Sequence, residues 1–245
     1  MNKLINNVLI SNGYDYLPPL DHNEIICVKD NILKRINILF EGLENKKISS
    51  LDEYLNNCEN IHNQLTKKYR LFEPSVVEKI KEFKFFQTLK NIFPDITITN
   101  EEKFYNEEVY WRLVRPNITD VGPVHADSWF WNLGVGDTPN NKVRIKIWVL
   151  IQSSDTYSGL IYYPKSHLFS FNYLSKKVEN KNKPIFSDSL DNYDHEHVNN
   201  KPGNVFIFND RLLHGGIPCN NGIRLSFEFT FLTSRTNLID NLKIN

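Results

Sequence analysis

The stretch IRLSFEFTFL, residues 223–232, alternates between apolar and polar side chains along most of its length. Successive side chains of a β-strand point to opposite faces, so this alternation predicts a strand with one buried face. Turn-forming residues separate further stretches that are rich in β-branched and aromatic residues. These stretches are 107–115 (EEVYWRLVR), 143–151 (VRIKIWVLI), 158–163 (SGLIYY) and 204–208 (NVFIF). The second half of the chain is therefore predicted to be built from antiparallel strands.

The first hundred residues predict helices instead. Apolar side chains in residues 30–43 recur at intervals of three and four, as one buried helix face requires. Two Ser-x-x-Glu sequences, at 50–53 and 75–78, have the form of a capping box, and an apolar stripe follows each of them. The second stripe predicts one helix over residues 75–93, which Pro94 ends.

Helices followed by many short strands favour an antiparallel barrel or jelly roll with helices packed outside it, and disfavour a βαβ fold. We expect residues 1–100 to form a helical region that packs on the barrel and residues 101–235 to form the barrel. Residues 175–200 are polar and turn-rich, so they are expected to be a long insertion that is either a lid or disordered. Residues 236–245 are expected to be a C-terminal tail.

Composition limits the possible partners of the chain. Its 245 residues include 29 basic and 29 acidic ones, and this zero net charge argues against a general nucleic-acid or membrane-surface binder. No stretch approaches about 18 uninterrupted apolar residues, and the N-terminus does not have the form of a secretory signal. Three cysteines without a CxxC spacing suggest reduced thiols. A cytoplasmic protein with a small-molecule substrate is the expectation, and its oligomeric state stays open.

Metal-ligating side chains occur in the sequence VGPVHADSWFW, residues 121–131. If His125 and Asp127 lie in a strand, both side chains point to the same face. An imidazole and a carboxylate are two of the three ligands of a facial triad, which leaves open positions on a non-haem Fe(II). His214 follows the predicted strand 204–208 and could be the third ligand. The sequence therefore predicts a metal centre, although each histidine could also be an ordinary core or loop residue.

Arg224 lies at the start of the final strand, with Ser226 on the same face. A guanidinium fork binds a carboxylate through two parallel hydrogen bonds, and a neighbouring hydroxyl can add a third. The alternative is structural: Glu228 lies on the same face and could pair with Arg224.

Two other sequences have the form of metal clusters. His22-Asn23-Glu24 lies in the helical part, where no strand would present its side chains to a cavity, and it is interpreted as surface. The sequence His195-Glu196-His197 lies within the polar insertion and is interpreted as a solvated loop.

From about residue 72 to residue 232 the chain resembles the phytanoyl-CoA hydroxylase-like Fe(II)/2-oxoglutarate-dependent dioxygenases. The resemblance is carried by the helix 75–93, the His-x-Asp sequence, and the stretches 147–167 (IWVLIQSSDTYSGLIYYPKSH) and 201–227 (KPGNVFIFNDRLLHGGIPCNNGIRLSF). One departure is Lys165, which stands where the family has the Gly of a Pro-Gly-Ser-His turn. This change affects a turn and not the predicted metal ligands.

The resemblance implies a double-stranded β-helix fold in which His125, Asp127 and His214 hold Fe(II). It also implies that Arg224, helped by Ser226, binds the distal carboxylate of 2-oxoglutarate, and that Trp148 lines the pocket of this cosubstrate. O₂ would be the second cosubstrate, and succinate and CO₂ would be released. Family halogenases lack the triad carboxylate, so Asp127 favours hydroxylation. These statements are expectations from the family and not from the spacing of the residues.

A small polar or anionic metabolite is the expected substrate. Arg112 and Arg115 could hold an anionic group, and Trp129 and Trp131 could reach the mouth of the pocket. Two alternatives belong to other classes: a jelly-roll binding module without catalysis, and a metal-dependent cupin-type enzyme that does not use 2-oxoglutarate.

Overall fold

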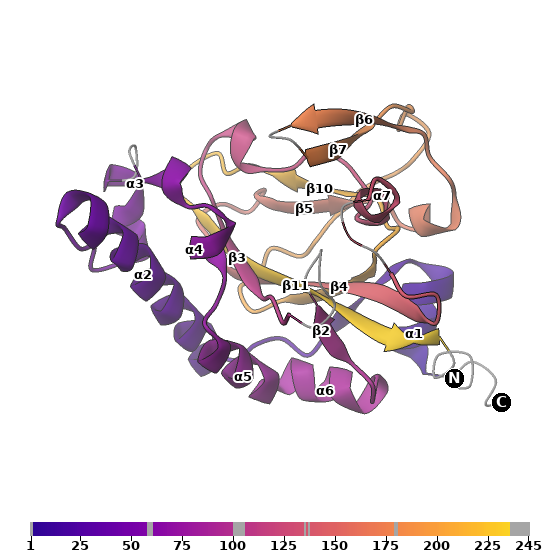
Figure 1. Ribbon diagram of the computed structural model, residues 1–245, viewed down its shortest axis with the longest axis horizontal. Helices are drawn as coiled ribbons and strands as arrows, with labels where there is room; N and C mark the ends of the chain where they lie inside the picture. The colour runs from indigo at the N-terminus through magenta and orange to yellow at the C-terminus, as the bar shows by residue number, and fades with distance from the viewer. Residues whose placement is uncertain are drawn as a thin grey trace.

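The computed structural model describes residues 2–57, 61–99, 106–134, 136, 138–178 and 181–235 (Figure 1). Among these residues the largest sheet has six strands, and its pairs are antiparallel. Its order is β1-β9-β4-β11-β2, and β3 also pairs with β11. The strands are β1 (Tyr14–Leu17), β2 (Thr97–Thr99), β3 (Tyr110–Val114), β4 (Lys142–Ser153), β9 (Val205–Asn209) and β11 (Arg224–Ser234).

A second sheet faces the first. It has the order β10-β5-β8, with β5 (Gly159–Tyr162), β8 (Glu196–His197) and β10 (His214–Ile217). A cluster of buried side chains joins Trp148 and Phe206 of the main sheet to Leu160 and Tyr162 of the second sheet, so the two sheets share an interior. The expected fold class, a mainly β jelly-roll core with N-terminal helices, is confirmed.

Strand β11 has two different faces. Leu225, Phe227, Phe229 and Phe231 are fully buried in the core that lies between the main sheet and the helices. The residues that alternate with them lie on the opposite face, and two of these, Arg224 and Glu228, line the pocket described below. The alternation in the sequence therefore separates a packing face from a face directed at the pocket.

Three helices cover the outer face of the main sheet: α2 (His22–Glu44), α5 (Pro74–Glu82) and α6 (Lys84–Ile92) (Figure 1). Phe85 of α6 packs against Phe227 and Phe229, with ring centroids 6.4 Å apart in both pairs. Burying a phenylalanine side chain stabilises the fold by about 2 kcal/mol. The shorter helical elements are α1 (Lys3–Asn6), η1 (Asn7–Ser11), η2 (Leu51–Glu53), α3 (Tyr54–Asn57), η3 (His62–Gln64), α4 (Lys67–Arg70), η4 (Ile118–Asp120), α7 (Ser128–Asn132) and η5 (Ser166–Leu168).

The predicted helix 75–93 is divided into α5 and α6. The break is at Phe83, whose backbone is extended (φ −63°, ψ 148°) and whose side chain is buried against the sheet. The predicted capping box at 75–78 is wrong, because α5 begins at Pro74 and its N-cap is Glu73, two residues before Ser75. Proline is well suited to that position, since its fixed φ is helical and its missing N–H is not needed there.

The capping box predicted at 50–53 is also wrong. The carboxylate of Glu53 accepts hydrogen bonds from the backbone N–H and the hydroxyl of Ser49, and Ser50 makes no capping bond. The described part of the chain has a capping box at Asp21 and Glu24, at the start of α2. The apolar stripe expected over residues 51–65 is divided among short helices, and Cys58 lies outside the described residues.

Part of the expected insertion is a β-hairpin, β6 (Tyr173–Val178) and β7 (Lys181–Phe186). The hairpin begins two residues before the predicted boundary at 175. The region expected to be helical contributes two strands to the main sheet, β1 and β2. The predicted tail, 236–245, lies outside the described residues.

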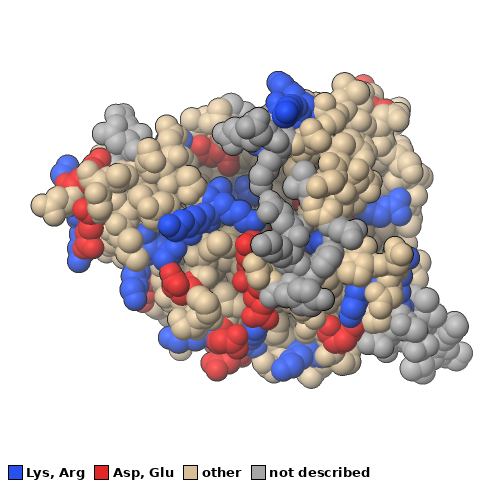
Figure 2. Space-filling model, viewed as in Figure 1, with Lys and Arg blue, Asp and Glu red and all other residues tan. Residues whose placement is uncertain are grey.

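Acidic and basic side chains are both distributed over the surface. Figure 2 shows Lys and Arg side chains gathered near the middle of one face, where α4 and β3 lie in Figure 1. A search of the described helices finds none with the length and apolar character needed to cross a membrane.

Candidate active site

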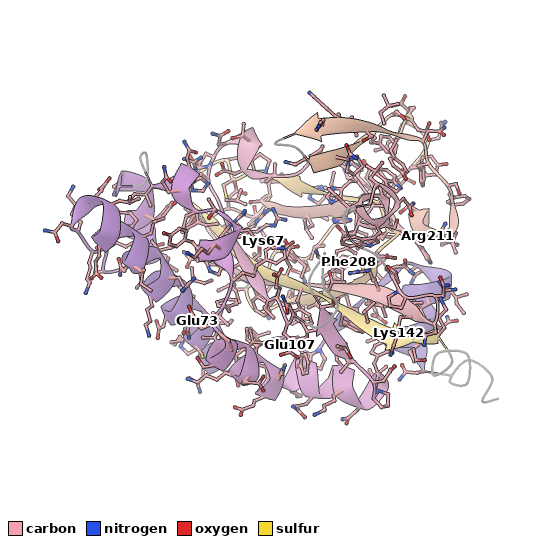
Figure 3. The ribbon with its side chains drawn as sticks, in the orientation of Figure 1. Lys67, Glu73, Glu107, Lys142, Phe208 and Arg211 are labelled. Atoms are coloured by element: carbon pink, nitrogen blue, oxygen red, sulfur yellow. The ribbon has the colours of Figure 1, made fainter. Side chains whose placement is uncertain are left out.

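A cavity of about 210 Å³ lies between the two sheets. Phe208, which Figure 3 labels in the interior, packs beside it with its ring centroid 4.8 Å from that of His214. Strands β3, β4, β10 and β11, helix α7 and the β6–β7 hairpin all contribute to the walls. The lining residues are Tyr110, Arg112, Asp120, Val121, Gly122, His125, Asp127, Phe130, Trp131, Lys146, Trp148, Leu160, Asn182, Lys183, His214, Gly216, Arg224 and Glu228.

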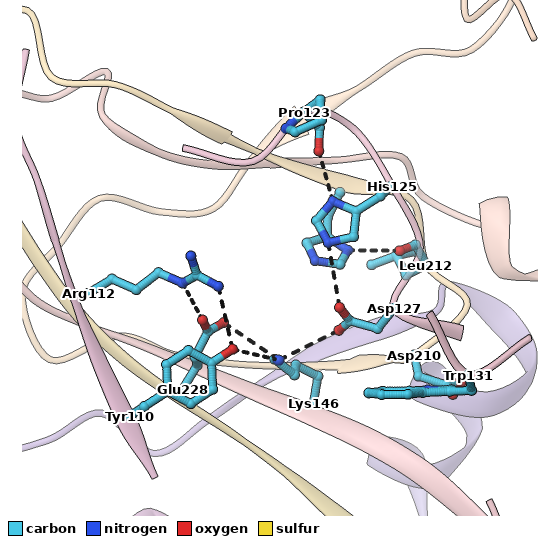
Figure 4. A network of polar contacts seen from close by, with 11 residues as sticks. Tyr110, Arg112, Pro123, His125, Asp127, Trp131, Lys146, Asp210, Leu212 and Glu228 are labelled. Carbon is cyan, nitrogen blue, oxygen red and sulfur yellow. Dashed lines mark hydrogen bonds and ion pairs between the residues drawn. The ribbon is translucent and has the colours of Figure 1, made fainter. Parts of the chain in front are cut away.

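His125, Asp127 and His214 come together in this cavity (Figure 4). One ligand atom from each lies within 4.8 Å of the others, and Nε2 of His125 is 3.5 Å from Oδ1 of Asp127. Within the part of the chain that the structure describes, they are the only group of three metal-ligating side chains close enough to hold one ion. The three predicted metal ligands are thus neighbours in space.

Both histidines are oriented by backbone carbonyl groups. Nδ1 of His125 lies 2.8 Å from the carbonyl oxygen of Pro123, and Nδ1 of His214 lies 3.0 Å from that of Leu212. Because a carbonyl oxygen only accepts, each Nδ1 carries the proton and donates it. Each Nε2 is therefore left as a lone-pair donor, the arrangement found at metal-ligating histidines.

The charge states of the ligands also suit a metal ion. Burial and the neighbouring His125 lower the pKa of His214 to about 4, so its imidazole is neutral at pH 7. Burial alone would raise the pKa of Asp127, but Lys146 and the two histidines outweigh it and hold this pKa well below its usual range. Two histidines and one carboxylate are a ligand set that fits a non-haem Fe(II) with open coordination positions. Oδ2 of Asp127 is buried without a hydrogen-bond partner among the described residues.

The local backbone differs from the predicted strand at 125–127. His125 forms an isolated antiparallel bridge with His214, in which each backbone N–H donates to the other's carbonyl at 2.9 Å. Asp127 is the N-cap of α7 and has helical dihedral angles (φ −60°, ψ −33°). The two side chains therefore meet because the chain turns into a helix, and not because they share the face of a strand.

Lys146 is a central residue of the site that the sequence analysis missed. Its Nζ lies 3.7 Å from Oδ2 of Asp127 and 3.7 Å from Oε2 of Glu228, and 3.5 Å from the hydroxyl of Tyr110 (Figure 4). The lysine is only 5% exposed. The signal was present in the sequence: Lys146 interrupts an apolar strand between two isoleucines, on the face opposite to theirs.

Lys146→Met is expected to destabilise the metal-free protein by about 3 kcal/mol, because two buried carboxylates lose their shared cation. The loss should be smaller in the Fe(II)-loaded protein, since a metal dication beside Asp127 replaces part of the missing charge. Chemical denaturation with and without Fe(II), under anaerobic conditions, measures both values.

Lys142→Met is the matched control for this experiment. Lys142 lies on the same strand, away from the pocket, and pairs with Asp95 at a partly exposed position (Figure 3). Its removal should cost less than about 1 kcal/mol, with no dependence on metal. Equal losses in the two variants would contradict the role assigned to Lys146.

Arg224 is 2% exposed, and one nitrogen of its guanidinium group, Nη1, is hydrogen-bonded to the backbone. Nη1 donates to the carbonyl oxygens of Gly159 at 2.5 Å and Ile217 at 2.9 Å. Nε is buried without a hydrogen-bond partner among the described residues, and so is the hydroxyl of Ser226. Burial lowers the pKa of Arg224 to about 10, so the group remains a cation at pH 7. The pocket lining thus includes a buried cation with an unused donor. The partnerless hydroxyl of Ser226 lies two residues along the same strand, outside the lining residues.

The remaining predicted residues divide into two groups. Arg112, Trp131 and Trp148 line the pocket, and Trp131 donates from Nε1 to Asp210 at 3.2 Å. Arg115 and Trp129 do not line it. The predicted pair of Arg224 with Glu228 is not formed, because the carboxylate of Glu228 binds Nε of Arg112 and lies beside Lys146.

The two residues outside the pocket have structural contacts. Arg115 donates to both carboxylate oxygens of Asp120, at 2.9 Å each. Trp129 stacks on Tyr173 and Phe186 of the β6–β7 hairpin, with ring centroids 4.7 and 5.9 Å apart and interplanar angles of 14° and 17°. A salt bridge and a ring stack occupy these two side chains, and their contact with the substrate stays a prediction.

The other two candidate clusters do not form metal sites among the described residues. Glu196 accepts hydrogen bonds from the hydroxyls of Tyr162 at 2.6 Å and Tyr14 at 3.1 Å. His22 is exposed in the first turn of α2.

An antiparallel jelly roll with a His-Asp-His triad and a cationic pocket between its sheets is the architecture of a metal-dependent oxygenase. The family model for phytanoyl-CoA dioxygenase (PhyH) matches residues 50–224, and the chain belongs to this family. The predicted family is thereby confirmed, and with it the enzyme class, which depends on iron and 2-oxoglutarate. No curated protein sequence matches the chain significantly.

Solved structures with the same fold are distant in sequence. EvdO2 from Micromonospora carbonacea var. aurantiaca, complexed with 2-oxoglutarate, is 11% identical over 96% of this chain and 91% of that one, with a TM-score of 0.59. The non-heme alpha ketoglutarate dependent carbocyclase SnoK, from nogalamycin biosynthesis, is 12% identical over 95% and 84%, with a TM-score of 0.56. The epimerase SnoN, in complex with Fe3+ and alpha ketoglutarate, is 13% identical over 99% and 89%, with a TM-score of 0.51.

Proposed function

We propose that this protein hydroxylates a small polar or anionic metabolite with Fe(II), 2-oxoglutarate and O₂, releasing succinate and CO₂. His125, Asp127 and His214 would hold the iron. Arg224 and Ser226 would bind the distal carboxylate of 2-oxoglutarate, beside Trp148. The single observation that carries the cosubstrate assignment is the pair of unused donors, Nε of Arg224 and the Ser226 hydroxyl, buried on one face of β11. Burying a cation without an anion is costly, so a dicarboxylate is the partner that this end of the pocket lacks.

When bound, iron and 2-oxoglutarate together supply the oxidising power that cleaves a substrate C–H bond. The chain supplies orientation and a dry, shaped cavity. The backbone carbonyls of Pro123 and Leu212 fix the two imidazole rings. Lys146 lies beside Oδ2 of Asp127, which leaves Oδ1 on the side of His125. These contacts hold the three ligand atoms before a metal arrives.

Hydroxylation is proposed over the other outcomes that this chemistry allows. Two proteins of similar fold are a carbocyclase and an epimerase, so the fold is compatible with several products. In halogenases a halide would bind iron at the position of the missing carboxylate. Asp127 supplies that carboxylate here, so the position is not available to a halide. Transfer of oxygen to the substrate is the outcome that needs no further group in the site.

The cytoplasmic location suggested by the cysteines stays a prediction.

An anaerobic titration of the metal-free protein with Fe(II), followed by 2-oxoglutarate, tests the proposed function. The expected result is a weak visible charge-transfer band that appears only when both are present. A folded protein that shows no band in the presence of iron would favour the binding-module alternative. A band without succinate release in a metabolite screen would leave cofactor binding in place and contradict turnover of the compounds tested.

We further propose that the β6–β7 hairpin is a lid over the substrate, anchored by Trp129. Asn182 and Lys183 of the hairpin line the pocket. Trp129→Ala removes two stacked contacts, so the hairpin should open more often and be cleaved by trypsin about tenfold faster. Limited proteolysis followed by mass spectrometry measures this rate.

Tyr157→Ala is the control for the lid experiment. This substitution also removes an aromatic ring, but Tyr157 is 67% exposed and lies outside the hairpin. Substrate should slow cleavage within residues 175–200 of the wild-type protein. Unchanged cleavage in the Trp129 variant, or with substrate present, would count against a lid.

A further inference from the structure

Arg112 projects into the pocket from β3, across from His125 (Figure 4). Its Nε is bound by the carboxylate of Glu228, and its Nη2 donates to the hydroxyl of Tyr110 at 3.4 Å. The third nitrogen, Nη1, forms no hydrogen bond or ion pair with any described residue. The side chain is 39% exposed although Glu228, its partner, is only 10% exposed. The guanidinium group is thus held firmly at one edge and is accessible from the pocket at another.

Positive charge is in excess around Arg112. Arg112, Lys146, Lys183 and Arg224 line the pocket, against Asp120, Asp127 and Glu228. Asp120 is already bound by Arg115, which lies outside the lining. The surplus of cations is therefore larger than the lining residues alone suggest.

A second guanidinium group lies behind Arg112. The side chain of Arg70, on α4, has no hydrogen bond or ion pair among the described residues, and its Nε is buried. Burial and the charge of Arg112 both lower the pKa of Arg70. Two neighbouring cations, of which Arg112 lines the pocket, raise the local potential and attract an anion.

Iron and 2-oxoglutarate would not cancel this surplus. A ferrous ion and a dicarboxylate dianion have equal and opposite charge. The four lining cations then outnumber Asp127 and Glu228, the lining carboxylates that Arg115 does not bind, by two. Arg112 is one of these cations: Glu228 holds its Nε in place, and its Nη1 makes no hydrogen bond with a described residue.

We propose that Arg112 binds an anionic oxygen group of the primary substrate, a carboxylate or a phosphate. The inference rests on the proposed function, because it assumes that iron and 2-oxoglutarate occupy the rest of the pocket. A guanidinium group suits such a ligand, since its planar donors match the spacing of two anionic oxygens. Lys183, from the hairpin, brings a second cation to the same cavity. The substrate class is therefore a small acid or phosphate monoester.

Equilibrium dialysis of the anaerobic protein, loaded with Fe(II) and 2-oxoglutarate, tests this inference. The probes are glycerol 3-phosphate, glycerate and the neutral glycerol, which share a three-carbon skeleton. We expect the two anions to bind with Kd values in the millimolar range, and glycerol to show no binding over the same range. The tighter of the two anions distinguishes a phosphate substrate from a carboxylate one. Retention of neither anion, or equal retention of glycerol, would overturn the proposal.

Arg112→Gln should weaken binding of the anionic probes about tenfold, as expected for the loss of one charge-assisted hydrogen bond. Arg112→Lys keeps the charge, and its affinity for the anionic probes should lie between those of Arg112→Gln and the wild-type protein. Lys90→Gln removes one positive charge from an exposed position on α6 and should change nothing. Thermal unfolding of each variant shows whether it is folded. Wild-type affinity of folded Arg112→Gln would contradict the proposal.

The charge-transfer band separates this inference from the proposed function. If wild type lacks the band, iron and cosubstrate binding fails, whatever the probes do. If the band forms and Arg112→Gln weakens the binding of 2-oxoglutarate but not that of the probes, Arg112 belongs to the cosubstrate site and the proposal is wrong. The expected result is an unchanged 2-oxoglutarate affinity in Arg112→Gln together with weaker probe binding.

Discussion

His214→Ala is expected to weaken Fe(II) binding by at least about a hundredfold and to reduce 2-oxoglutarate turnover to background. Loss of groups that merely orient a metal ligand already costs up to about a hundredfold in affinity, and His214 is proposed as a ligand itself. The neutral imidazole with its Nδ1 fixed by Leu212 is the specific feature that the variant loses. Anaerobic titration with Fe(II), followed through the charge-transfer band, measures the effect.

His22→Ala is the matched control, because His22 is an exposed histidine in a similar His-x-acid sequence on α2. It should keep the band and the iron affinity of the wild-type protein. An intact band in His214→Ala would show that iron binds elsewhere. Loss of the band in both variants would point to a general effect on folding, which far-UV circular dichroism would reveal.

Arg224→Ala is expected to raise the Kd of 2-oxoglutarate by about thirtyfold to a hundredfold, equivalent to about 2–3 kcal/mol. The physical reason is the loss of a buried cation whose Nε has no hydrogen-bond partner among the described residues. Iron affinity should be nearly unchanged, because Arg224 contacts none of the three proposed ligands. Titration of 2-oxoglutarate into the Fe(II)-loaded variant, again through the band, gives the Kd.

Arg115→Ala removes the same side chain from a position that does not line the pocket, and it serves as the control. Its 2-oxoglutarate affinity should stay within about twofold of wild type. A small effect of Arg224→Ala on turnover would favour the cupin-type alternative, in which the arginine has no dicarboxylate to bind. Partial rescue by Arg224→Lys would show how much of the affinity comes from charge and how much from the fork geometry.

The sequence was sufficient to predict the fold because its periodicity is strong where the core is formed. In β11 the buried and pocket-facing residues alternate as the period of two requires, and the structure places Phe227 and Glu228 on the predicted opposite faces. Residues 30–43 are likewise helical. Short elements were less predictable: β1 and β2 have four and three residues, too few for a periodic signal, and they are held by pairing with β9 and β11.

The site was predictable in its residue types but not in its local geometry. His125, Asp127 and His214 are close together as expected, yet Asp127 begins a helix. The role of Lys146 depends on two acidic residues, Asp127 and Glu228, that are far from it in sequence, so no local pattern could identify the network. Trp129 faces the hairpin because a helical turn directs adjacent residues to different sides, whereas Trp131 reaches the pocket.

The two faces of β11 have a consequence for how this enzyme can change over evolutionary time. Leu225, Phe227, Phe229 and Phe231 determine how much folded protein a cell obtains, because they form the core against the helices. Glu228 and its partner Arg112 point the other way and contribute little to that core. Substitutions at these two positions can therefore alter which compounds are accepted without disturbing that core. Because the two side chains form a charge pair, replacing them together avoids leaving one buried charge unpaired. Such a division makes the strand evolvable: the pocket face can change while the packing face stays the same.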